Sequence, residues 1–364
     1  MKFKNFIVVA ASSVMVLAVS AWLFFGTPAE FSFSERRELV QMPEFSLSSF
    51  KSGKFMTDFD KFSTDQLPLR DTLRTLKAYA AKYLFAQTDN NDIYVYNGYA
   101  AKMEAAENEE SAENAAQKIK QIRDLYLKDN TGRVMFSVIP DKNCYLAEKS
   151  GHLTVNPEFF ADKIAQANPE IGYIDISDLL DETDFYFTDT HWRQEKITDV
   201  AGRIAESFGI TLSAEYEQKT LDIPFYGVYS GQSALPLDAE EIHYLTNDVL
   251  ENCRVFDYQN NKETAVYDME KAGGKDPYEM FLSGPISLVT IENPNASTDR
   301  ELVIFRDSFG SSLAPLLAEG YAKITLADTR YIQPQILGKW IDFSRCDVLF
   351  IYSTLILNSS EMFK

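Results

Sequence analysis

The chain has 364 residues, a formal net charge of −19, 45% hydrophobic, 24% charged and 13% aromatic residues. This composition excludes an intrinsically disordered chain, and the length allows one large hydrophobic core or two smaller ones. The acidic balance repels phosphate groups, so no nucleic-acid partner is expected. Three cysteines without CxxC spacing allow one disulfide at most, and the three histidines form no HxH or HxxxH pair. We therefore expect no metal and no cofactor.

The amino-terminal end carries an uninterrupted apolar stretch over residues 6–25, preceded by Lys2 and Lys4. A helix of this length, at about 1.5 Å per residue, spans roughly the 30 Å hydrocarbon core of a bilayer. The positive-inside rule keeps the two lysines in the cytoplasm and sends the rest of the chain outward. Residues 1–27 are thus predicted to form an uncleaved anchor of a single-pass protein in the cell membrane, with an extracytoplasmic carboxyl-terminal domain. A cleaved signal peptide, which would leave the protein secreted, is the alternative, although its apolar region is usually shorter and ends in small residues.

Residues 28–105 are predicted to form a tether and a helical lead-in. Apolar residues recur at three- and four-residue spacing over 53–85, which indicates helices interrupted at Leu67 and Pro68. A short strand with a turn at Asn97 and Gly98 follows within 93–103.

Residues 106–364 alternate between short apolar strands and helices. Strands are predicted over 133–140, 171–177, 301–308, 323–328 and 347–354, and helices over 108–128, 192–208, 309–321 and 332–341, the third kinked near Pro315. This alternation predicts an α/β domain with a mostly parallel sheet covered on both faces. Residues 210–300 break the rhythm and are predicted to be an insertion of β-structure and loops packed over one end of the sheet.

Ser308 lies where a predicted strand ends and a helix begins. A hydroxyl at such a junction points from the carboxyl end of the sheet, where open α/β sheets bind ligands. The free N–H groups of the new helix suit a developing oxyanion. The alternative is a plain helix N-cap, a common role for serine.

Asp189 and His191 lie two residues apart at the predicted start of a helix. A serine hydroxyl is a weak nucleophile at neutral pH and needs a base such as histidine, which a carboxylate can orient. The alternative is a structural pair that satisfies the start of the helix. His152 and His243 lie in a polar loop and in the insertion, so neither has the context of a strand end.

Several separated motifs resemble the DHHW family, which is related to the SGNH hydrolase-like alginate O-acetyltransferases AlgJ and AlgX. The resemblance covers most of the exported part of the chain, at residues 35–46, 53–71, 138–146, 187–192 and 306–332. It implies an SGNH-hydrolase-like three-layer sandwich in which Asp189 orients His191, His191 is the base and Ser308 is the nucleophile. The chain departs from the family pattern at Thr190, where the name motif usually has histidine, and at Arg306, where the SGNH serine block has glycine. The second departure puts a backbone oxyanion donor in doubt.

Further candidates follow other predicted strand ends. Lys142 and Arg330 supply cations that could bind an anionic sugar or polarise an acyl oxygen, and surface ion pairs are the alternative. Trp192 and Tyr331 are candidates for stacking on sugar rings, with buried packing as the alternative. Gly231, in the stretch 229–234, is a candidate oxyanion donor.

Two functions remain open from the sequence. The first, implied by the resemblance, is an extracytoplasmic, membrane-anchored carbohydrate O-acetyltransferase or acetylesterase that acts on cell-wall polysaccharide or exopolysaccharide through an acyl-enzyme. It implies a membrane-bound acyltransferase partner as the acetyl donor. The second is a non-catalytic envelope protein that uses the same fold to bind glycan or to act as a scaffold.

Overall fold

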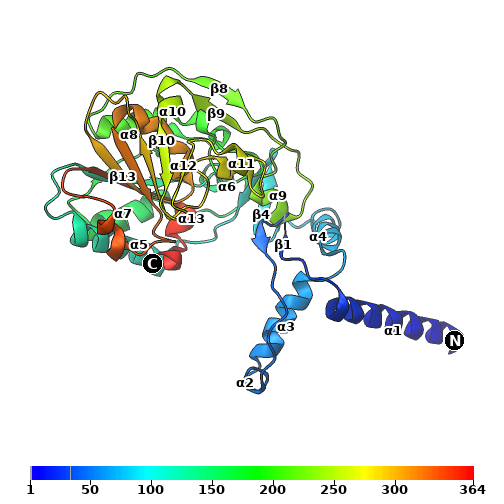
Figure 1. Cartoon of the computed structure of the whole chain (residues 1–364). Coiled ribbons are helices and arrows are strands. Elements are labelled where there is room, and N and C mark those ends of the chain that lie inside the picture. Colours follow the sequence, from blue (N-terminus) through cyan, green and yellow to red (C-terminus); the bar gives the residue numbers. More distant parts are fainter. Residues whose placement is uncertain (1, 33) are drawn as a thin grey trace. The chain divides into compact units, whose positions relative to one another are not determined.

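The structure is a computed structural model that describes residues 2–32 and 34–364 (Figure 1). It divides into two compact units, of which the first comprises residues 1–91 and 230–236 and the second residues 92–229 and 237–364. Each unit has its own packing.

The first unit is mostly helical. Its helix α1 is long and apolar enough over Lys4–Phe25 to cross a membrane, and a signal sequence near the amino terminus has the same properties. Ion pairs of Arg37 and Arg70 with Asp65 join the segment after α1 to the ends of α3 and α4. The elements of this unit are α1 (Lys2–Phe25), β1 (Phe31–Ser32), β2 (Arg37–Glu38), α2 (Leu47–Lys51), α3 (Lys54–Asp65), α4 (Arg70–Tyr79), the π-helix η1 (Ala80–Leu84) and β3 (Asp89–Asn90). Helix α9 (Val228–Ser233) begins in the second unit and ends within residues 230–236 of the first unit.

An eight-stranded sheet forms the centre of the second unit, in the order β11-β10-β12-β14-β13-β15-β6-β7. The five strands from β14 to β7 are parallel, and β12, β10 and β11 continue the sheet in antiparallel pairing. The strands are β6 (Val134–Ile139), β7 (Gly172–Tyr173), β10 (Arg254–Asp257), β11 (Lys262–Thr264), β12 (Leu288–Glu292), β13 (Glu301–Arg306), β14 (Lys323–Ala327) and β15 (Asp347–Ser353). The predicted α/β class with a mostly parallel sheet is confirmed.

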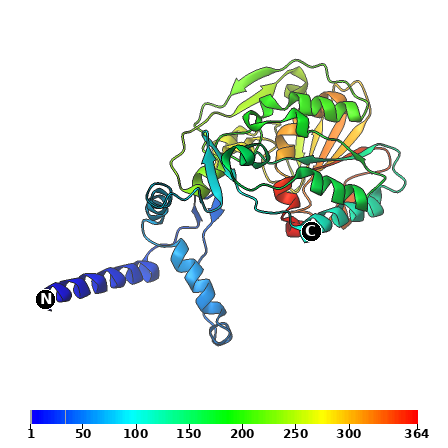
Figure 2. The ribbon, with the colours of Figure 1, turned by 180° about the vertical axis from the view of Figure 1, so that it is seen from behind.

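Helices cover both faces of this sheet (Figure 1 and Figure 2). Alternate residues of the central strands point to opposite faces, so Leu302 and Ile304 of β13 join one core while Val303 and Phe305 join the other. The first core includes α8 (Thr198–Ser207), α10 (Asp248–Asn252), α12 (Phe309–Leu313) and the 3₁₀-helix η6 (Ala314–Gly320). The second includes α5 (Glu109–Tyr126), α7 (Pro157–Ala167), α13 (Thr354–Leu357) and the 3₁₀-helix η7 (Pro334–Lys339).

The remaining elements of the second unit are short. A hairpin of two strands turns at Asn97 and Gly98, both with positive φ, as the Asn-Gly pair predicts. The other elements are β4 (Ile93–Tyr96), β5 (Tyr99–Lys102), α6 (Asn143–Ser150), β8 (Glu217–Thr220), β9 (His243–Thr246) and α11 (Met269–Ala272), with the 3₁₀-helices η2 (Ser177–Leu179), η3 (Glu182–Asp184), η4 (Gln194–Lys196), η5 (Pro277–Met280) and η8 (Ser360–Met362).

Two sequence-based expectations differ from the structure, and a third is confirmed. The helix predicted over 192–208 begins only at Thr198, so Asp189 and His191 lie in an irregular loop and not at a helix start. The predicted break near Pro315 is present: the helix after Ser308 becomes 3₁₀ at Ala314, because proline lacks the N–H that continues an α-helix. The segment 210–300 supplies β10, β11 and β12 to the edge of the main sheet as well as covering structure.

Candidate active site

Ser308 follows β13 at the carboxyl edge of the parallel sheet and occupies the N-cap position of α12. Its side chain makes no capping hydrogen bond, and its Oγ instead lies 2.7 Å from Nε2 of His191. The neighbouring carboxylate of Asp307 takes over the capping role by accepting the Phe309 N–H at 3.0 Å. The Ser308 residue is half-buried. Its hydroxyl therefore bonds to the imidazole of His191 and not to a backbone group of its own helix.

His191 and Asp189 form the second part of the arrangement. Nδ1 of His191 lies 2.6 Å from Oδ1 of Asp189, which also accepts the His191 backbone N–H at 3.1 Å. The other carboxylate oxygen accepts the Val228 N–H at 2.8 Å. Asp189 is almost completely buried and His191 nearly so. Because the carboxylate fixes Nδ1 as the donor, Nε2 is left as the nitrogen that can take a proton from Ser308.

The plane of the His191 ring is fixed by aromatic neighbours. Tyr278 stacks on the ring with centroids 3.8 Å apart and planes at 8°, and Phe309 lies at 4.9 Å in a tilted contact. The Tyr278 hydroxyl is 2.8 Å from Oγ of Ser312, which also accepts the Trp192 indole N–H at 2.9 Å. The imidazole is thus packed between the Tyr278 ring and Phe309 of the helix that follows Ser308.

The loop that carries Asp189 is held by the half-buried carboxylate of Glu240. Glu240 accepts the backbone N–H groups of Phe187 and Thr188, each at 2.7 Å, and the Thr188 hydroxyl at 2.5 Å. Burial raises the pKa of Glu240 above its ordinary value, while these hydrogen bonds favour its charged form. Gly227 lies so close that a Cβ there would come within 2.2 Å of the Thr188 carbonyl carbon. Only glycine therefore fits at position 227 beside this loop.

Lys142 follows β6 and is fully buried. Its ammonium donates to the carbonyl oxygens of Tyr186 at 2.7 Å, Asp189 at 2.6 Å and Phe187 at 3.3 Å, and lies 5.1 Å from the centre of the Tyr229 ring. Burial lowers the pKa of the Lys142 ammonium to about 8, although the negative charge of Asp141 acts to raise it. The structure therefore turns Lys142 toward the backbone of the Asp189 loop, and we propose that it positions this loop and does not bind substrate directly.

Asp307 connects the Ser308 turn to the next strand. Its second carboxylate oxygen accepts the Ser353 N–H at 2.7 Å, at the end of β15. Arg306, the residue in place of the expected glycine, is fully buried and lies 3.6 Å from Asp328. Space for its side chain comes from Gly310, where a Cβ would approach the Arg306 Cβ to 2.6 Å. The departure from the SGNH pattern at Arg306 is thus matched by a glycine four residues later.

The other predicted residues occupy different surroundings. Trp192 is completely buried in the core, so it is not available to stack on a sugar. Arg330 makes two hydrogen bonds to Asp328, at 2.9 and 2.7 Å, and Tyr331 beside it is 46% exposed. Gly231 belongs to the first unit, where its carbonyl accepts a hydrogen bond from Arg74 at 2.8 Å, and no oxyanion role is proposed for it.

Sequence reasoning missed Tyr278, Glu240 and Gly227. All three lie in the segment 210–300, which has no regular apolar period, so its residues could not be assigned to a face or an edge. The sequence does not distinguish Gly227 from other loop glycines, because a lone glycine in a loop occurs in many kinds of turn. Among residues 2–32 and 34–364 there is no cluster of three or more His, Cys, Asp or Glu side chains arranged to hold a metal ion.

Comparisons with known proteins give similarity in fold. No family model matches the chain, and no curated protein matches it in sequence. A DHHW family protein from Eubacterium siraeum is similar in structure, with a TM-score of 0.61 and 18% identity over 75% of this chain and 94% of that one. PatB1 of Bacillus cereus, solved with a sulfonyl adduct, gives a TM-score of 0.58 and 16% identity over 73% of this chain and 95% of that one. The O-acetyltransferase domain of Pseudomonas putida AlgJ also matches, with a TM-score of 0.41 and 12% identity over 69% of this chain and 84% of that one. The predicted resemblance is confirmed at the level of structure, and this chain has the fold of the DHHW family protein and of PatB1.

Proposed function

We propose that the protein is an extracytoplasmic, membrane-anchored carbohydrate O-acetyltransferase or acetylesterase that acts on cell-wall polysaccharide or exopolysaccharide. The observation that carries the proposal is the continuous relay from Ser308 Oγ to His191 Nε2, at 2.7 Å, and from His191 Nδ1 to Asp189 Oδ1, at 2.6 Å. Hydroxyl, imidazole and buried carboxylate in this order activate a serine nucleophile.

The chemistry runs in two steps. Ser308 Oγ attacks the carbonyl carbon of the donor's acetyl group while its proton passes to His191 Nε2. The tetrahedral intermediate then collapses, and the leaving oxygen of the donor takes that proton, which leaves an acetyl ester on Ser308. In the second step a sugar hydroxyl or a water gives its proton to Nε2 and attacks the ester, and Ser308 Oγ recovers the proton as it leaves.

The developing oxyanion needs donors near the attacked carbonyl. The backbone N–H of Ser308 has no acceptor within the chain among the residues that the structure describes. It lies at the amino-terminal end of α12, beside the attacking oxygen. We propose this N–H as one oxyanion donor.

The choice of acetyl esters and carbohydrate depends on the resemblance of the sequence motifs. The sulfonyl adduct of PatB1, whose fold this chain shares, suggests a probe, because sulfonyl groups react with activated nucleophiles. Acetyl groups outside the cytoplasm do not come directly from cytosolic acetyl-CoA. For the transferase activity the proposal therefore includes a membrane-bound acyltransferase partner as donor, and α1 would anchor this chain in the same membrane as that partner.

The test uses the whole chain in detergent. We expect it to release acetate from p-nitrophenyl acetate and to react with phenylmethylsulfonyl fluoride at Ser308, which intact-mass and peptide mass spectrometry would locate. Ser308→Ala should lose at least about 10³-fold in rate and all labelling, because the nucleophile is absent. The matched control is Ser311→Ala, three residues along α12, which should keep both.

Two results would count against the proposal. Equal rates in the wild-type chain and Ser308→Ala would assign the hydrolysis to another group. An unlabelled wild-type chain that still binds polysaccharide saturably would favour the non-catalytic alternative. Supplying a deacetylated polysaccharide as acceptor separates transfer from hydrolysis, because only transfer adds acetyl groups to the polymer.

A further inference from the structure

The first unit contains a helix whose apolar side faces outward. Leu69, at the N-cap of α4, is 76% exposed, and Leu76 is 64% exposed. The exposed apolar residues continue at helical spacing through the end of η1, as Leu69, Leu73, Leu76, Tyr79, Tyr83, Leu84 and Phe85. A surface helix of a globular protein normally buries its apolar stripe and exposes its charges.

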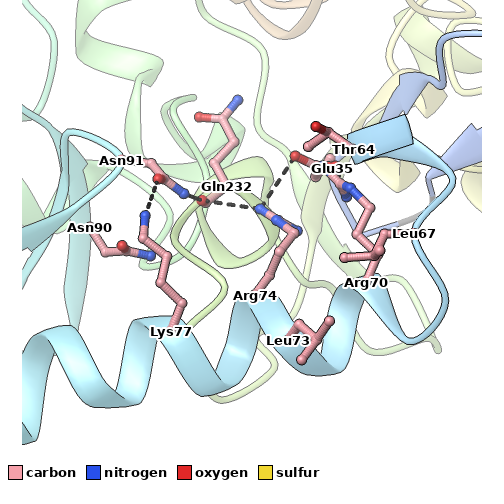
Figure 3. A pocket seen from close by; sticks show the side chains of 10 residues that line it. All are labelled: Glu35, Thr64, Leu67, Arg70, Leu73, Arg74, Lys77, Asn90, Asn91 and Gln232. Carbon is pink, nitrogen blue, oxygen red and sulfur yellow. Dashed lines mark hydrogen bonds and ion pairs between the residues drawn. The ribbon is translucent and has the colours of Figure 1, made fainter. Parts of the chain in front are cut away.

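The arginines of α4 face the protein instead, while Asp71 in its first turn is 66% exposed. Figure 3 shows Arg74 and Lys77 extending from the helix toward Glu35, Asn91 and Gln232. These side chains line a cavity of about 560 Å³. Arg74 lies 3.3 Å from Glu35, and Lys77 donates to Asn91 at 3.0 Å. The cations of α4 are therefore engaged within the unit, and the leucines remain without a covering layer among the described residues.

A second apolar surface lies on α2 and α3 in the same unit. Phe45 and Phe50 are exposed, as are Leu47 and Met56. Phe45 contacts Phe55 with ring centroids 5.3 Å apart, and Phe55 stacks on Phe59 at 6.1 Å. This surface is too large and continuous to be a scatter of single exposed side chains.

The aromatic rings connect this second surface to α1. Phe59 stacks on Phe24 at 6.0 Å, and Phe24 lies in the last turn of the helix that is apolar enough to cross a membrane. Residues next to the end of a membrane-spanning helix lie at the level of the lipid head groups. The line of rings from Phe24 to Phe45 therefore begins at the membrane surface.

Residues at the borders of the two surfaces suit the same level. Tyr79 and Tyr83 are exposed and are in tilted ring contact with centroids 5.5 Å apart, and tyrosine is enriched where a bilayer meets water. Lys51, Lys54 and Lys82 are exposed beside the apolar residues. Lysine can bury its alkyl chain in the apolar layer while its ammonium reaches the phosphates.

We propose that the first unit lies on the membrane surface at which α1 ends, with the apolar faces of α2–α3 and of α4–η1 inserted among the lipid head groups. The occupant of both faces is thus the lipid itself. Amphipathic helices of this kind insert roughly 5–10 Å into the boundary between head groups and acyl chains. This inference does not depend on the proposed acyl transfer.

The test measures the depth of single nitroxide labels in the full chain. Cys144, Cys253 and Cys346 are free and are replaced by serine or alanine. One cysteine is then introduced as Leu76→Cys or Met56→Cys, and the matched control is Leu153→Cys, an exposed leucine of the second unit. The labelled chains are reconstituted in vesicles of phosphatidylcholine with phosphatidylglycerol, and collisions with oxygen and with a nickel chelate are compared by power saturation.

We expect labels at positions 76 and 56 to collide with oxygen and to be shielded from nickel, at a depth of roughly 5–10 Å below the phosphates. The label at 153 should collide freely with nickel. Nickel access at 76 and 56 equal to that at 153 would overturn the proposal. Shielding from both reagents would also overturn it, since it would assign the faces to a second copy of the chain or to another protein.

A second measurement uses the unaltered chain and needs no cysteine replacement. A phospholipid with a diazirine in its acyl chain is photolysed in the same vesicles, and the cross-linked peptides are mapped by mass spectrometry. Cross-links are expected within residues 45–59 and 69–85 in addition to α1. Cross-links confined to residues 2–25 would contradict the proposal.

Discussion

The loop at residues 187–191 in the second unit and helix α4 in the first unit use polar and apolar groups in opposite ways. In the loop, backbone N–H groups are satisfied by Glu240 and backbone carbonyl groups by the buried Lys142, and the result is a fixed imidazole. In α4, charged side chains satisfy one another within the unit while leucines face outward. The first arrangement determines the geometry of a reaction, and the second leaves a surface for a partner outside the chain. Substitutions in the two regions should therefore affect different properties.

The largest effect is expected at Asp189. In Asp189→Asn an amide replaces the carboxylate that accepts from Nδ1, so His191 loses the tautomer that leaves Nε2 free to take a proton. We expect esterase activity to fall by about 10³- to 10⁴-fold with little change in fold. The measurement is steady-state hydrolysis of p-nitrophenyl acetate, with circular dichroism as the check on folding.

A matched control separates this effect from the loss of any one negative charge. Asp178 is 62% exposed at its side chain and pairs with Arg203 on the surface. Asp178→Asn should keep nearly all activity, because exposed ion pairs contribute little. If the two variants had equal activity, Asp189 would have no part in the reaction.

The next effect is expected at Gly227. A Cβ there would lie 2.2 Å from the Thr188 carbonyl carbon and 2.3 Å from the Asp189 nitrogen, and both contacts are with backbone. Gly227→Ala should therefore push the Asp189 loop away and lower the free energy of unfolding by about 3 kcal/mol or more. Urea unfolding followed by circular dichroism measures the change.

The control for this substitution is Gly202 in α8, where an added Cβ meets nothing within 4 Å. Gly202→Ala should raise the free energy of unfolding by about 0.5–1 kcal/mol, because alanine favours the helix. A Gly227→Ala chain as stable and as active as the wild type would mean that the loop is not held as closely as its contacts indicate.

Much of this fold and part of the site follow from local sequence. The strands β6, β13, β14 and β15 are continuous apolar runs because both of their faces are buried, and their order along the chain places Ser308 at the carboxyl edge. Asp189 and His191 lie two residues apart, so their pairing depends on local sequence alone. These features depend on short-range pattern, which the sequence displays directly.

The rest depends on tertiary contacts that have no local pattern. The end of β6 places Lys142 at the correct edge, but the sequence does not reveal that its side chain turns inward to three carbonyl groups. Tyr278 reaches the His191 ring from the short 3₁₀-helix η5, in a segment without a regular apolar period. The outward leucines of α4 carry the expected helical period, and period alone does not say which side of a helix faces the protein.

A smaller effect is expected from the proton of Lys142. Burial lowers its pKa in the folded protein to about 8, from 10.5. Between these two values the unfolded chain binds more protons than the folded one, so the free energy of unfolding should rise with pH, by on the order of 2 kcal/mol from about pH 7.5 to about pH 9.5. Lys142→Met keeps most of the side-chain volume and lacks this proton, so its stability should lack this rise. The measurement is urea unfolding of both chains at the two pH values, and parallel changes in the two chains would show that Lys142 does not titrate in this range.

The smallest effect on folding is expected at Leu76, because its side chain is exposed, and a buried leucine of the second unit gives the contrast. Leu313 in α12 is fully buried, and Leu313→Ala should lower the free energy of unfolding by about 2–5 kcal/mol through the cavity that it leaves. Leu76 contributes its exposed side chain to the outward face of α4, so Leu76→Gln should change stability in detergent by less than about 0.5 kcal/mol. Amide hydrogen exchange across residues 70–79 measures this locally. Faster exchange in Leu76→Gln would show that the leucine packs within the first unit, whereas unchanged exchange in detergent together with weaker protection in vesicles would show that it acts only when lipid is present.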